Sequence, residues 1–481
     1  MEMNTPPNLF ERLNNWIKES VTIKLMSIGF LILILMIPSS WIESLITERQ
    51  MRAESVIREI SDKWSGEQTI SGPVLVVPFL KREKIDKGKE GIEIREWTQK
   101  AFFLPEQLTI DGKVNPQVLH RGIFEAAVYE STISMQSQFV KPDFAKLSID
   151  AKDVLWKDAY LVLGINDLRG ISKNPIIKAG VADLISEPSN QIGLSTQFSQ
   201  STNDSSDGDR ATAVGYSQSS IIENGLIAKL PWQKPEDFIS QVSISLGLKG
   251  STLLYFVPAG KTTHVQLEGP WADPSFTGSF SPSDRKVSEA GFSATWNILH
   301  YNRPFAQQWV GEGQKLSGSE FGVRLLIPVG QYQKSMRTAK YGVLVILLTF
   351  VALFMVEIMR KIRIHPFQYI LIGAALIIYY SLLLSFSEHV GYNIAYLISS
   401  IATVVLVSLY SLTFLITKRL VLIFSVLLSF FYTFIFVIIQ LQDYSLLLGS
   451  IGLFLIIGLI MYFSKNIQWY KEDVLADRVS S

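Results

Sequence analysis

Six long runs of apolar residues constrain this chain more than any other feature of its sequence. The first covers residues 25–41, and five more follow in close succession at residues 341–358, 366–385, 392–416, 420–439 and 446–463. A helix needs roughly 20 apolar residues to cross the hydrocarbon core of a bilayer, and each run is close to that length. Helices of a water-soluble bundle would show polar faces at helical spacing, whereas these runs are apolar nearly all round. We therefore predict six transmembrane helices, one N-terminal and five C-terminal.

The first run is expected to stay in the protein as an anchor. A secretory signal peptide ends in a small-x-small cleavage site, and the sequence Pro38-Ser-Ser-Trp41 that closes this run does not supply a good one. The interpretation as a cleaved signal peptide is therefore disfavoured.

Positive charges in the short connections predict the orientation. Lys and Arg concentrate on the cytoplasmic side of membrane proteins, and the rule applies best to short loops. Connections two-to-three and four-to-five and the C-terminal tail are basic, while residues 386–391 and 440–444 contain no Lys or Arg. Both termini are then cytoplasmic, and the long segment between the first two helices is exported. The cations that carry this prediction are Arg360, Lys361, Arg363, Lys418, Arg419, Lys465 and Lys471.

The exported segment has the pattern of a β-rich soluble domain. Residues 241–249 and 264–268 alternate strictly between apolar and polar, as in a strand that buries one face. Further strands are predicted at residues 74–80, 92–103, 122–139, 160–165, 252–257 and 321–329, which Gly, Pro, Asn or Asp residues bound. We expect an antiparallel sandwich or two packed sheets, entered by a helix over residues 42–64 and interrupted by a mobile polar loop at 195–220.

The predicted fold class is therefore α+β. A mainly-β domain is inserted between the first and second of six transmembrane helices. The expected boundaries are a cytoplasmic tail at 1–21, the first helix at 22–46, the β-rich domain at 47–340, a five-helix bundle at 341–463 and a second cytoplasmic tail at 464–481.

Composition excludes several classes of function. Lys and Arg total 44 and Asp and Glu total 43, a formal net charge of +1, which gives no basic field for binding nucleic acid. The chain has no cysteine, so disulfides, thiolate catalysis and cysteine metal sites are excluded.

Several sequence stretches have the pattern of a known family. They include Arg363-Ile-His-Pro-Phe-Gln-Tyr369, Tyr379-Tyr-Ser-Leu-Leu-Leu-Ser-Phe-Ser-Glu-His389, Ile70-Ser-Gly-Pro73, Gly269-Pro-Trp271, Asn302-Arg-Pro304 and Gln442-Asp-Tyr-Ser-Leu-Leu-Leu-Gly-Ser450. Together these stretches resemble the CreD family of inner-membrane proteins, which are associated with cell-envelope integrity in Gram-negative bacteria. The resemblance implies an envelope protein of the bacterial inner (plasma) membrane, with residues 47–340 in the periplasm, often under two-component control. It defines no biochemical activity and supplies no catalytic residues. Gly330 departs from the family pattern, where an acidic residue is expected.

A polar cluster is predicted at the outer ends of the helices. It combines Glu388 and His389 with Gln440, Gln442 and Asp443. Such a group would be suited to binding a cation, relaying protons or docking the exported domain. The alternative is that these residues only cap helices in the wet interface, where charges cost far less than at the midplane.

Four polar residues near the second connection have structural interpretations. Glu357 lies three and four residues before Arg360 and Lys361, the spacing of a helical salt bridge. His365 and Gln368 flank Pro366, which favours a cap at the start of a helix over a ligand site.

Motifs for catalysis and cofactors are weak. Ser283-Asp-Arg-Lys286 matches the Ser-x-x-Lys pattern of penicillin-recognising enzymes, but the companion motifs are missing. Asn203–Gly208 resembles a calcium loop, yet Val214 stands where the bidentate Glu should be. We predict no enzyme activity and no cofactor.

Aromatic residues concentrate between residues 269 and 309. They are expected to form a β-core, although a groove for a lipid tail or glycan is the competing interpretation.

The predicted function is that of a non-enzymatic membrane protein that supports envelope integrity or a stress response through its exported domain. The expected partners are membrane lipids and an envelope protein, glycan or lipid, and not nucleic acid. The rival prediction is a transporter or lipid-handling protein that uses Glu388, His389 and Asp443.

Overall fold

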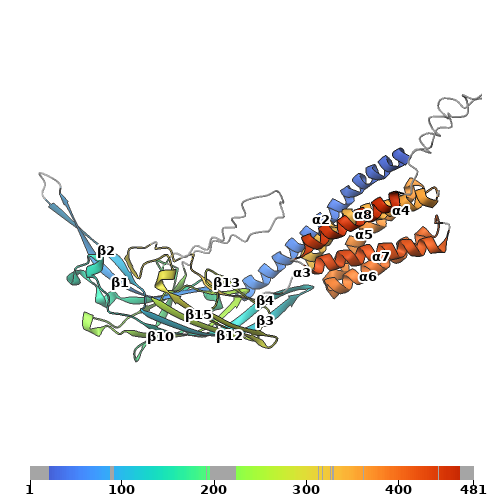
Figure 1. The fold of residues 1–481 in the computed structure, drawn as a ribbon. Coiled ribbons are helices and arrows are strands. Elements are labelled where there is room, and N and C mark those ends of the chain that lie inside the picture. The colour runs from blue at the N-terminus through green and yellow to red at the C-terminus, as the bar shows by residue number, and fades with distance from the viewer. Residues whose placement is uncertain are drawn as a thin grey trace, which may run out of the picture. The chain divides into compact units, whose positions relative to one another are not determined.

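The computed structural model describes residues 21–86, 92–190, 192–194, 224–312, 314–316, 318–325, 327, 330–360, 362–415, 417–441 and 444–465. The chain forms two compact units, which are described separately below (Figure 1). The helical unit comprises Met1–Glu54 and Val329–Ser481, and the β unit comprises Ser55–Pro328. The fold class is α+β, with a large β-rich region and apolar helices of which one is N-terminal.

Most helices of the chain are long and apolar. Within the described residues, five helical segments are long and apolar enough to cross a bilayer, and α8 holds a shorter apolar stretch, Leu447–Tyr462. Five or six of the predicted spans are thus present as helices. The helices are α2 (Val21–Trp64), α3 (Gly330–Lys340), α4 (Gly342–Arg360), α5 (Pro366–Val390), α6 (Tyr392–Ser411), α7 (Lys418–Gln440) and α8 (Ser445–Ser464).

The boundaries of the two units differ from those expected from sequence. The helical unit takes in α3 and the chain up to Glu54, which the sequence pattern assigned to the β-rich domain. The reason is the amphipathic face of α3, whose Tyr332, Ser335 and Thr338 are buried against the other helices of this unit. Helix α2 continues without interruption from the first apolar run to Trp64, so the predicted entering helix extends the first span.

The β unit consists of two sheets. Sheet A has nine strands in the order β13-β17-β11-β1-β5-β9-β8, with β2 paired to β1 and β16 paired to β2. Sheet B has eight strands in the order β14-β15-β12-β3-β4-β10-β6-β7. The strands are β1 (Gln68–Asp86), β2 (Ile92–Phe103), β3 (Gln107–Arg121), β4 (Phe124–Gln138), β5 (Tyr160–Ile165), β6 (Ile176–Ala179), β7 (Ala182–Leu184), β8 (Ser186–Ser189), β9 (Gly225–Lys229), β10 (Gln241–Ser251), β11 (Leu253–Phe256), β12 (Thr262–Gly269), β13 (Pro274–Gly278), β14 (Asp284–Ser288), β15 (Gly291–Leu299), β16 (Gln308–Val310) and β17 (Phe321–Leu325).

The sequence analysis expected antiparallel strands, but each of the two sheets also contains one parallel pair. Strands β1 and β11 pair in parallel in sheet A, and strands β3 and β12 pair in parallel in sheet B. The chain passes from β1 through β2, both in sheet A, to β3 in sheet B, whereas β11 of sheet A is followed directly by β12 of sheet B.

Alternating side chains place the core of the β unit. In β10 the buried positions are Val242, Ile244, Leu246 and Leu248, and the residues between them face outward. Complete burial of each such aliphatic side chain contributes about 1.5–3 kcal/mol. The aromatic region between residues 269 and 309 supplies core rings, as predicted, and Trp296 is fully buried against Phe321.

The strand predictions are confirmed at residues 92–103 and 160–165 and, within longer strands, at 241–249 and 264–268. Strands β9, β13 and β14 were not predicted, and they are short and show little alternation; the longer β3 and β15 were also missed, although they alternate. The polar loop at 195–220 and the calcium-like sequence within it lie outside the described residues.

Candidate functional site

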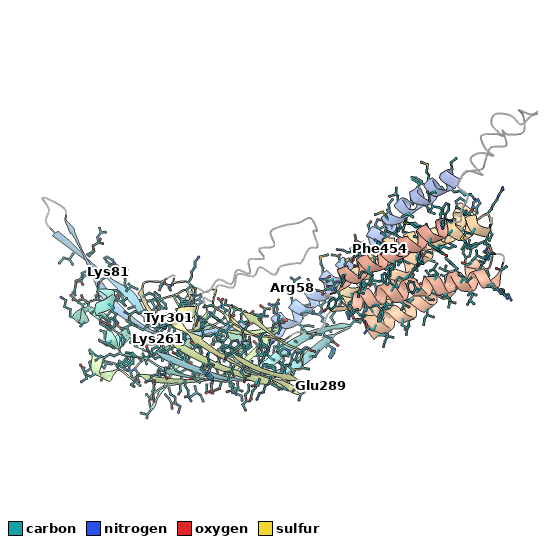
Figure 2. The ribbon with its side chains drawn as sticks, viewed as in Figure 1. Arg58, Lys81, Lys261, Glu289, Tyr301 and Phe454 are labelled. Carbon is teal, nitrogen blue, oxygen red and sulfur yellow. The ribbon has the colours of Figure 1, made fainter. Side chains whose placement is uncertain are left out.

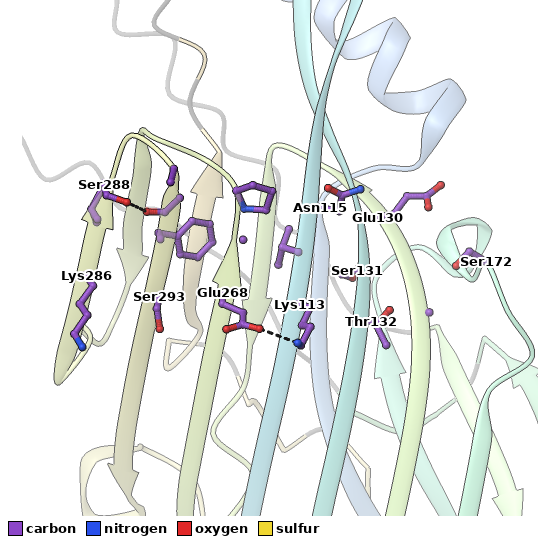
Figure 3. Close-up of a pocket in the computed structure, with 18 of the residues that line it drawn as sticks. Lys113, Asn115, Glu130, Ser131, Thr132, Ser172, Glu268, Lys286, Ser288 and Ser293 are labelled. Carbon is purple, nitrogen blue, oxygen red and sulfur yellow. Dashed lines mark hydrogen bonds and ion pairs between the residues drawn. The ribbon is translucent and has the colours of Figure 1, made fainter.

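An open groove of about 790 Å³ lies on the outward face of sheet B (Figure 3). The strands that form it come from widely separated parts of the sequence, because β3 and β4 pair with β12 on one side and with β10 on the other. The side chains of the groove are those that alternate with the core residues on the same strands. Burial of the apolar face therefore presents the polar face to the groove.

One row of side chains forms the floor of the groove. Strand register sets these residues side by side across six strands, at the spacing of about 4.8 Å that separates neighbouring strands. From one edge to the other the row is Lys286, Ser293, Glu268, Lys113, Thr132 and Gly247.

Two walls bound this floor. On one side Ser172 and Lys173 lie over Gly247, where an added Cβ would come within 2.9 Å of the Ser172 hydroxyl oxygen. On the other side, Pro270 and the hairpin that joins β14 to β15 line the groove. Gly291 in this hairpin has a positive φ of 148°, and an added Cβ there would approach the Gly269 carbonyl oxygen to 2.4 Å. Glycine at these two positions thus keeps both walls close to the floor.

The charges in the groove are only partly compensated. Lys113 Nζ lies 3.0 Å from Glu268 Oε1, and Lys249 Nζ lies 3.2 Å from Glu130 Oε1. Lys173 and Lys286 make no ion pair within the part of the chain that the structure describes. Figure 3 shows the Lys113–Glu268 pair at the centre of the floor and Lys286 at its edge. The lining of the groove therefore contains two lysines without an ion-pair partner in the described residues, one on each side.

The Ser283-x-x-Lys286 sequence does not form a pair of nucleophile and base in the described residues. Ser283 donates to the Thr295 carbonyl oxygen at 2.9 Å and accepts from the Asn297 side chain at 3.2 Å. No hydrogen bond joins Ser283 to Lys286 in the described residues, as acyl-enzyme chemistry would require. Across the described ranges, no group of three or more His, Asp or Glu side chains is placed to hold a metal ion.

The predicted polar cluster is only partly assembled. Glu388 accepts a hydrogen bond from the Tyr332 hydroxyl at 3.1 Å, and His389 is exposed. Gln440 accepts from Lys334 Nζ at 3.4 Å and donates to Asn393 Oδ1 at 2.6 Å. The predicted residues Gln442 and Asp443 lie outside the described residues.

Helix α3 is thus the element that meets the predicted cluster. Tyr332 and Lys334 both belong to it, and its Thr338 shares a hydrogen bond of 2.6 Å with the Tyr392 hydroxyl on α6. The sequence pattern did not predict these partners, because it placed α3 in the exported domain.

The partners of Glu357 correct the sequence prediction. The carboxylate is buried and accepts from Lys24 Nζ at 2.6 Å, from the Ile364 backbone amide at 3.2 Å and from the Tyr369 hydroxyl at 3.1 Å. Arg360, one expected partner, is exposed and forms no ion pair with Glu357, and Lys361 lies outside the described residues. Glu357 therefore joins α4 to α2 and to the start of α5, because its side chain faces the interior of the helical unit.

His365 and Gln368 form a capping box at the start of α5. His365 Nδ1 accepts from the Phe367 backbone amide at 3.2 Å, and the His365 backbone amide donates to Gln368 Oε1 at 3.0 Å. With Pro366 at the first helical position, these contacts satisfy backbone groups that a helix start leaves unpaired. Both side chains are thus engaged in local structure.

Two comparisons with known proteins agree with each other. The model of the protein family described as "Inner membrane protein CreD" matches residues 20–470. The chain is 28% identical over 455 residues to the Inner membrane protein CreD of Escherichia coli (strain K12), an alignment that covers 93% of each chain.

Proposed function

This chain belongs to the CreD family of inner membrane proteins, and we propose that it supports the integrity of the cell envelope, without enzyme activity, by binding an envelope component on the outward face of sheet B. Family membership and several membrane-length apolar helices make it a multi-pass protein of the inner membrane. The groove, with its hydrogen-bonding floor and two uncompensated lysines, is the observation that carries the proposal.

The proposal requires residues 47–340 to be periplasmic and both termini to be cytoplasmic. Support comes from the basic residues of the short connections, such as Lys418 and Arg419. Because the chain lacks cysteine, single cysteines can report the orientation without background. We expect an impermeant thiol reagent to label Val181→Cys in intact spheroplasts and Lys418→Cys only after lysis. The reverse pattern would invert the topology and exclude the proposal.

The β unit should carry the cellular function. We expect replacement of residues 55–328 by a flexible linker to sensitise cells to detergents and large antibiotics as strongly as deletion of the gene. The matched control is a chain with Lys146→Gln and Lys152→Gln, two exposed lysines outside the groove, which should behave as wild type. Normal resistance in the linker variant, with membrane insertion verified, would contradict the proposal.

A transporter or lipid-handling protein is the second candidate, and one observation favours it. The interior of the helical unit contains hydroxyl groups with no hydrogen-bond partner in the described residues, among them those of Thr349, Ser399 and Tyr432. Buried polar groups inside a membrane often mark a pathway. This candidate predicts that Glu388→Gln, His389→Ala and Asp443→Asn impair envelope function although the β unit is intact. Wild-type behaviour of all three variants would exclude it.

A further inference from the structure

We propose that the groove of sheet B binds an acidic glycan, namely a chain of amino sugars that carries carboxylate groups. The inference rests on the proposed function only in taking this groove as the recognition surface. It names the class of ligand from three features of the groove: its floor, its single apolar wall and its unpaired charges.

Next to the floor of the groove, the same strands supply hydrogen-bonding side chains that suit a polyhydroxylated ligand. Beside the first row, strand register sets a second row of outward side chains across the same strands. Apart from Asp284 and Asp111 these side chains are neutral hydroxyls and amides, which both donate and accept hydrogen bonds. The second row consists of Asp284, Thr295, Gln266, Asp111, Ser134 and Ser245.

The polar face continues beyond the groove. A second hollow of about 250 Å³ lies on the same face of sheet B, lined by Gln107, Thr109, Gln136, Gln138, Gln241 and Ser243 among others. On β3, Thr109 is four residues from Lys113, so the two hollows are separated by about 14 Å at about 3.4 Å per residue. Two polar hollows in line along the same strands fit an extended chain better than a compact small molecule.

The apolar surface of the groove is too small for an acyl chain. Val114 and Phe292 belong to the lining but are only 2% and 4% exposed. The remaining apolar surface is a short strip formed by Pro270, Val287 and Ala290. Such a strip can cover the CH face of one sugar ring or an acetamido methyl group, whereas a lipid tail would need a continuous apolar channel.

A peptide that adds a strand is also a poor fit. That mode of binding needs a sheet edge with free backbone groups. The centre of the floor consists of β15, β12, β3 and β4, each of which pairs with a neighbour on both sides. Recognition at the centre therefore depends on side chains.

The two unpaired lysines call for acidic groups on the ligand. Lys173 and Lys286 stand on opposite sides of the groove, whereas Lys113 and Lys249 form ion pairs with Glu268 and Glu130. Carboxylates spaced along a saccharide chain would complement Lys173 and Lys286, while the neutral sugar hydroxyls would lie over the hydroxyl and amide side chains between them.

The test uses the full chain in lipid nanodiscs and two soluble probes of equal length. One is a β-linked amino-sugar tetrasaccharide with lactyl carboxylates, and the other is its neutral N-acetylated counterpart. We expect the acidic probe to bind more tightly and to weaken as salt is raised. The combined Lys173→Gln and Lys286→Gln variant should bind the acidic probe about tenfold more weakly and the neutral probe unchanged.

Two further variants make the result interpretable. Lys146→Gln combined with Lys152→Gln changes charge equally outside the groove and should bind both probes as wild type does. Thr132→Val should weaken both probes, since it removes a floor hydroxyl. Thermal unfolding of each variant checks that the β unit is folded. Equal binding of the acidic probe by wild type and the lysine variant, or no binding of either probe to the wild type, would overturn the inference.

Failure of the inference can be told apart from failure of the proposed function. If neither glycan binds but the combined Lys173 and Lys286 variant still sensitises cells, the groove serves another ligand and only the glycan assignment fails. If the acidic glycan binds but loss of the β unit leaves the envelope intact, the proposed function fails and the binding site stands.

Discussion

The two units of the chain expose opposite kinds of side chain, although both bury apolar residues. In the β unit, aliphatic and aromatic residues such as Val265 and Trp296 are fully buried, and Ser, Thr, Gln and Lys face outward. In the helical unit the outward residues are large and apolar, as for Phe454, which is 76% exposed (Figure 2), whereas Ser399 and Glu357 are buried. A protein exposes what its surroundings solvate, so the comparison indicates water around one unit and hydrocarbon around the other.

Helix α6 shows the inversion most clearly. Its outward side chains include Ile394, Leu397, Ile401, Val405 and Leu409, each at least half exposed. Its buried face carries hydroxyl groups at helical spacing instead of a hydrophobic stripe. In an apolar environment the packing of such groups and of aromatic rings holds helices together, since hydrophobic burial offers little. The buried hydroxyl-bearing residues of α6 are Tyr392, Tyr396, Ser399, Ser400, Thr403 and Ser411.

The two units should differ most in the stability that they lose when a large aromatic ring is removed. Trp296→Ala empties a fully buried site in the β unit and should cost about 3–5 kcal/mol of its stability. Phe454→Ala removes an exposed ring and should change stability by less than about 0.5 kcal/mol. Denaturant unfolding of the full chain, followed by protease resistance of each unit, measures both effects. Similar losses in the two variants would mean that Phe454 is buried in the protein.

A charge added to an outward-facing residue should cost more free energy in the helical unit than in the β unit, the reverse of the order for ring removal. Ile401→Arg places a cation on the apolar face of α6 and should cost about 2.5–3.5 kcal/mol in membrane insertion. Val181→Arg, at a fully exposed position of the β unit, should stay within about 0.5 kcal/mol of wild type. An insertion assay with glycosylation reporters on the α6 segment, together with expression of each full chain, checks the pair. Tolerance of Ile401→Arg would place α6 outside the hydrocarbon.

The buried carboxylate of the helical unit offers a third contrast. Glu357→Gln leaves Lys24 without its partner and should destabilise the helical unit by about 2 kcal/mol, since Lys24 remains partly solvated. Adding Lys24→Met to this variant should recover much of the loss, because no uncompensated charge then remains. Thermal unfolding in detergent would show both steps. No recovery in the double variant would mean that the contacts with Ile364 and Tyr369, and not the ion pair, set the cost.

The sequence predicted the helices and several strands because each depends on a pattern within one short segment. Apolar length locates membrane-length helices, and strict alternation locates strands such as residues 241–249. The cap formed by His365 and Gln368 is equally local, since its contacts span at most three residues.

The groove and the partners of Glu357 could not be predicted in this way. Lys286 and Thr132 share one row of the floor only because four intervening strand pairings bring them together across about 150 residues of chain. Lys24 and Glu357 are 333 residues apart, so the nearby Arg360 offered a closer but incorrect partner. The spacing of residues in the sequence identifies only partners a few positions away, and it does not show which distant helix packs against a given side chain.

The smallest expected effect concerns pH, where a water-facing unit should respond through individual carboxylates. Asp167 lies where α2 meets the sheets and accepts from Ser65, Gly66 and Arg169. Burial opposes its ionisation, but the hydrogen bonds from Arg169 and Gly66 outweigh burial and lower the pKa to about 2 from an ordinary 3.8. Because the folded pKa is the lower one, the stabilisation is complete above about pH 4 and is lost as the pH falls towards 2.

Asp167→Asn should lower the stability of the β unit at pH 7 by less than about 1.5 kcal/mol and flatten its decline in acid. Proteolysis midpoints of the β unit at pH 7 and pH 3 measure both changes, and an unaltered acid decline in the variant would assign that decline to other carboxylates.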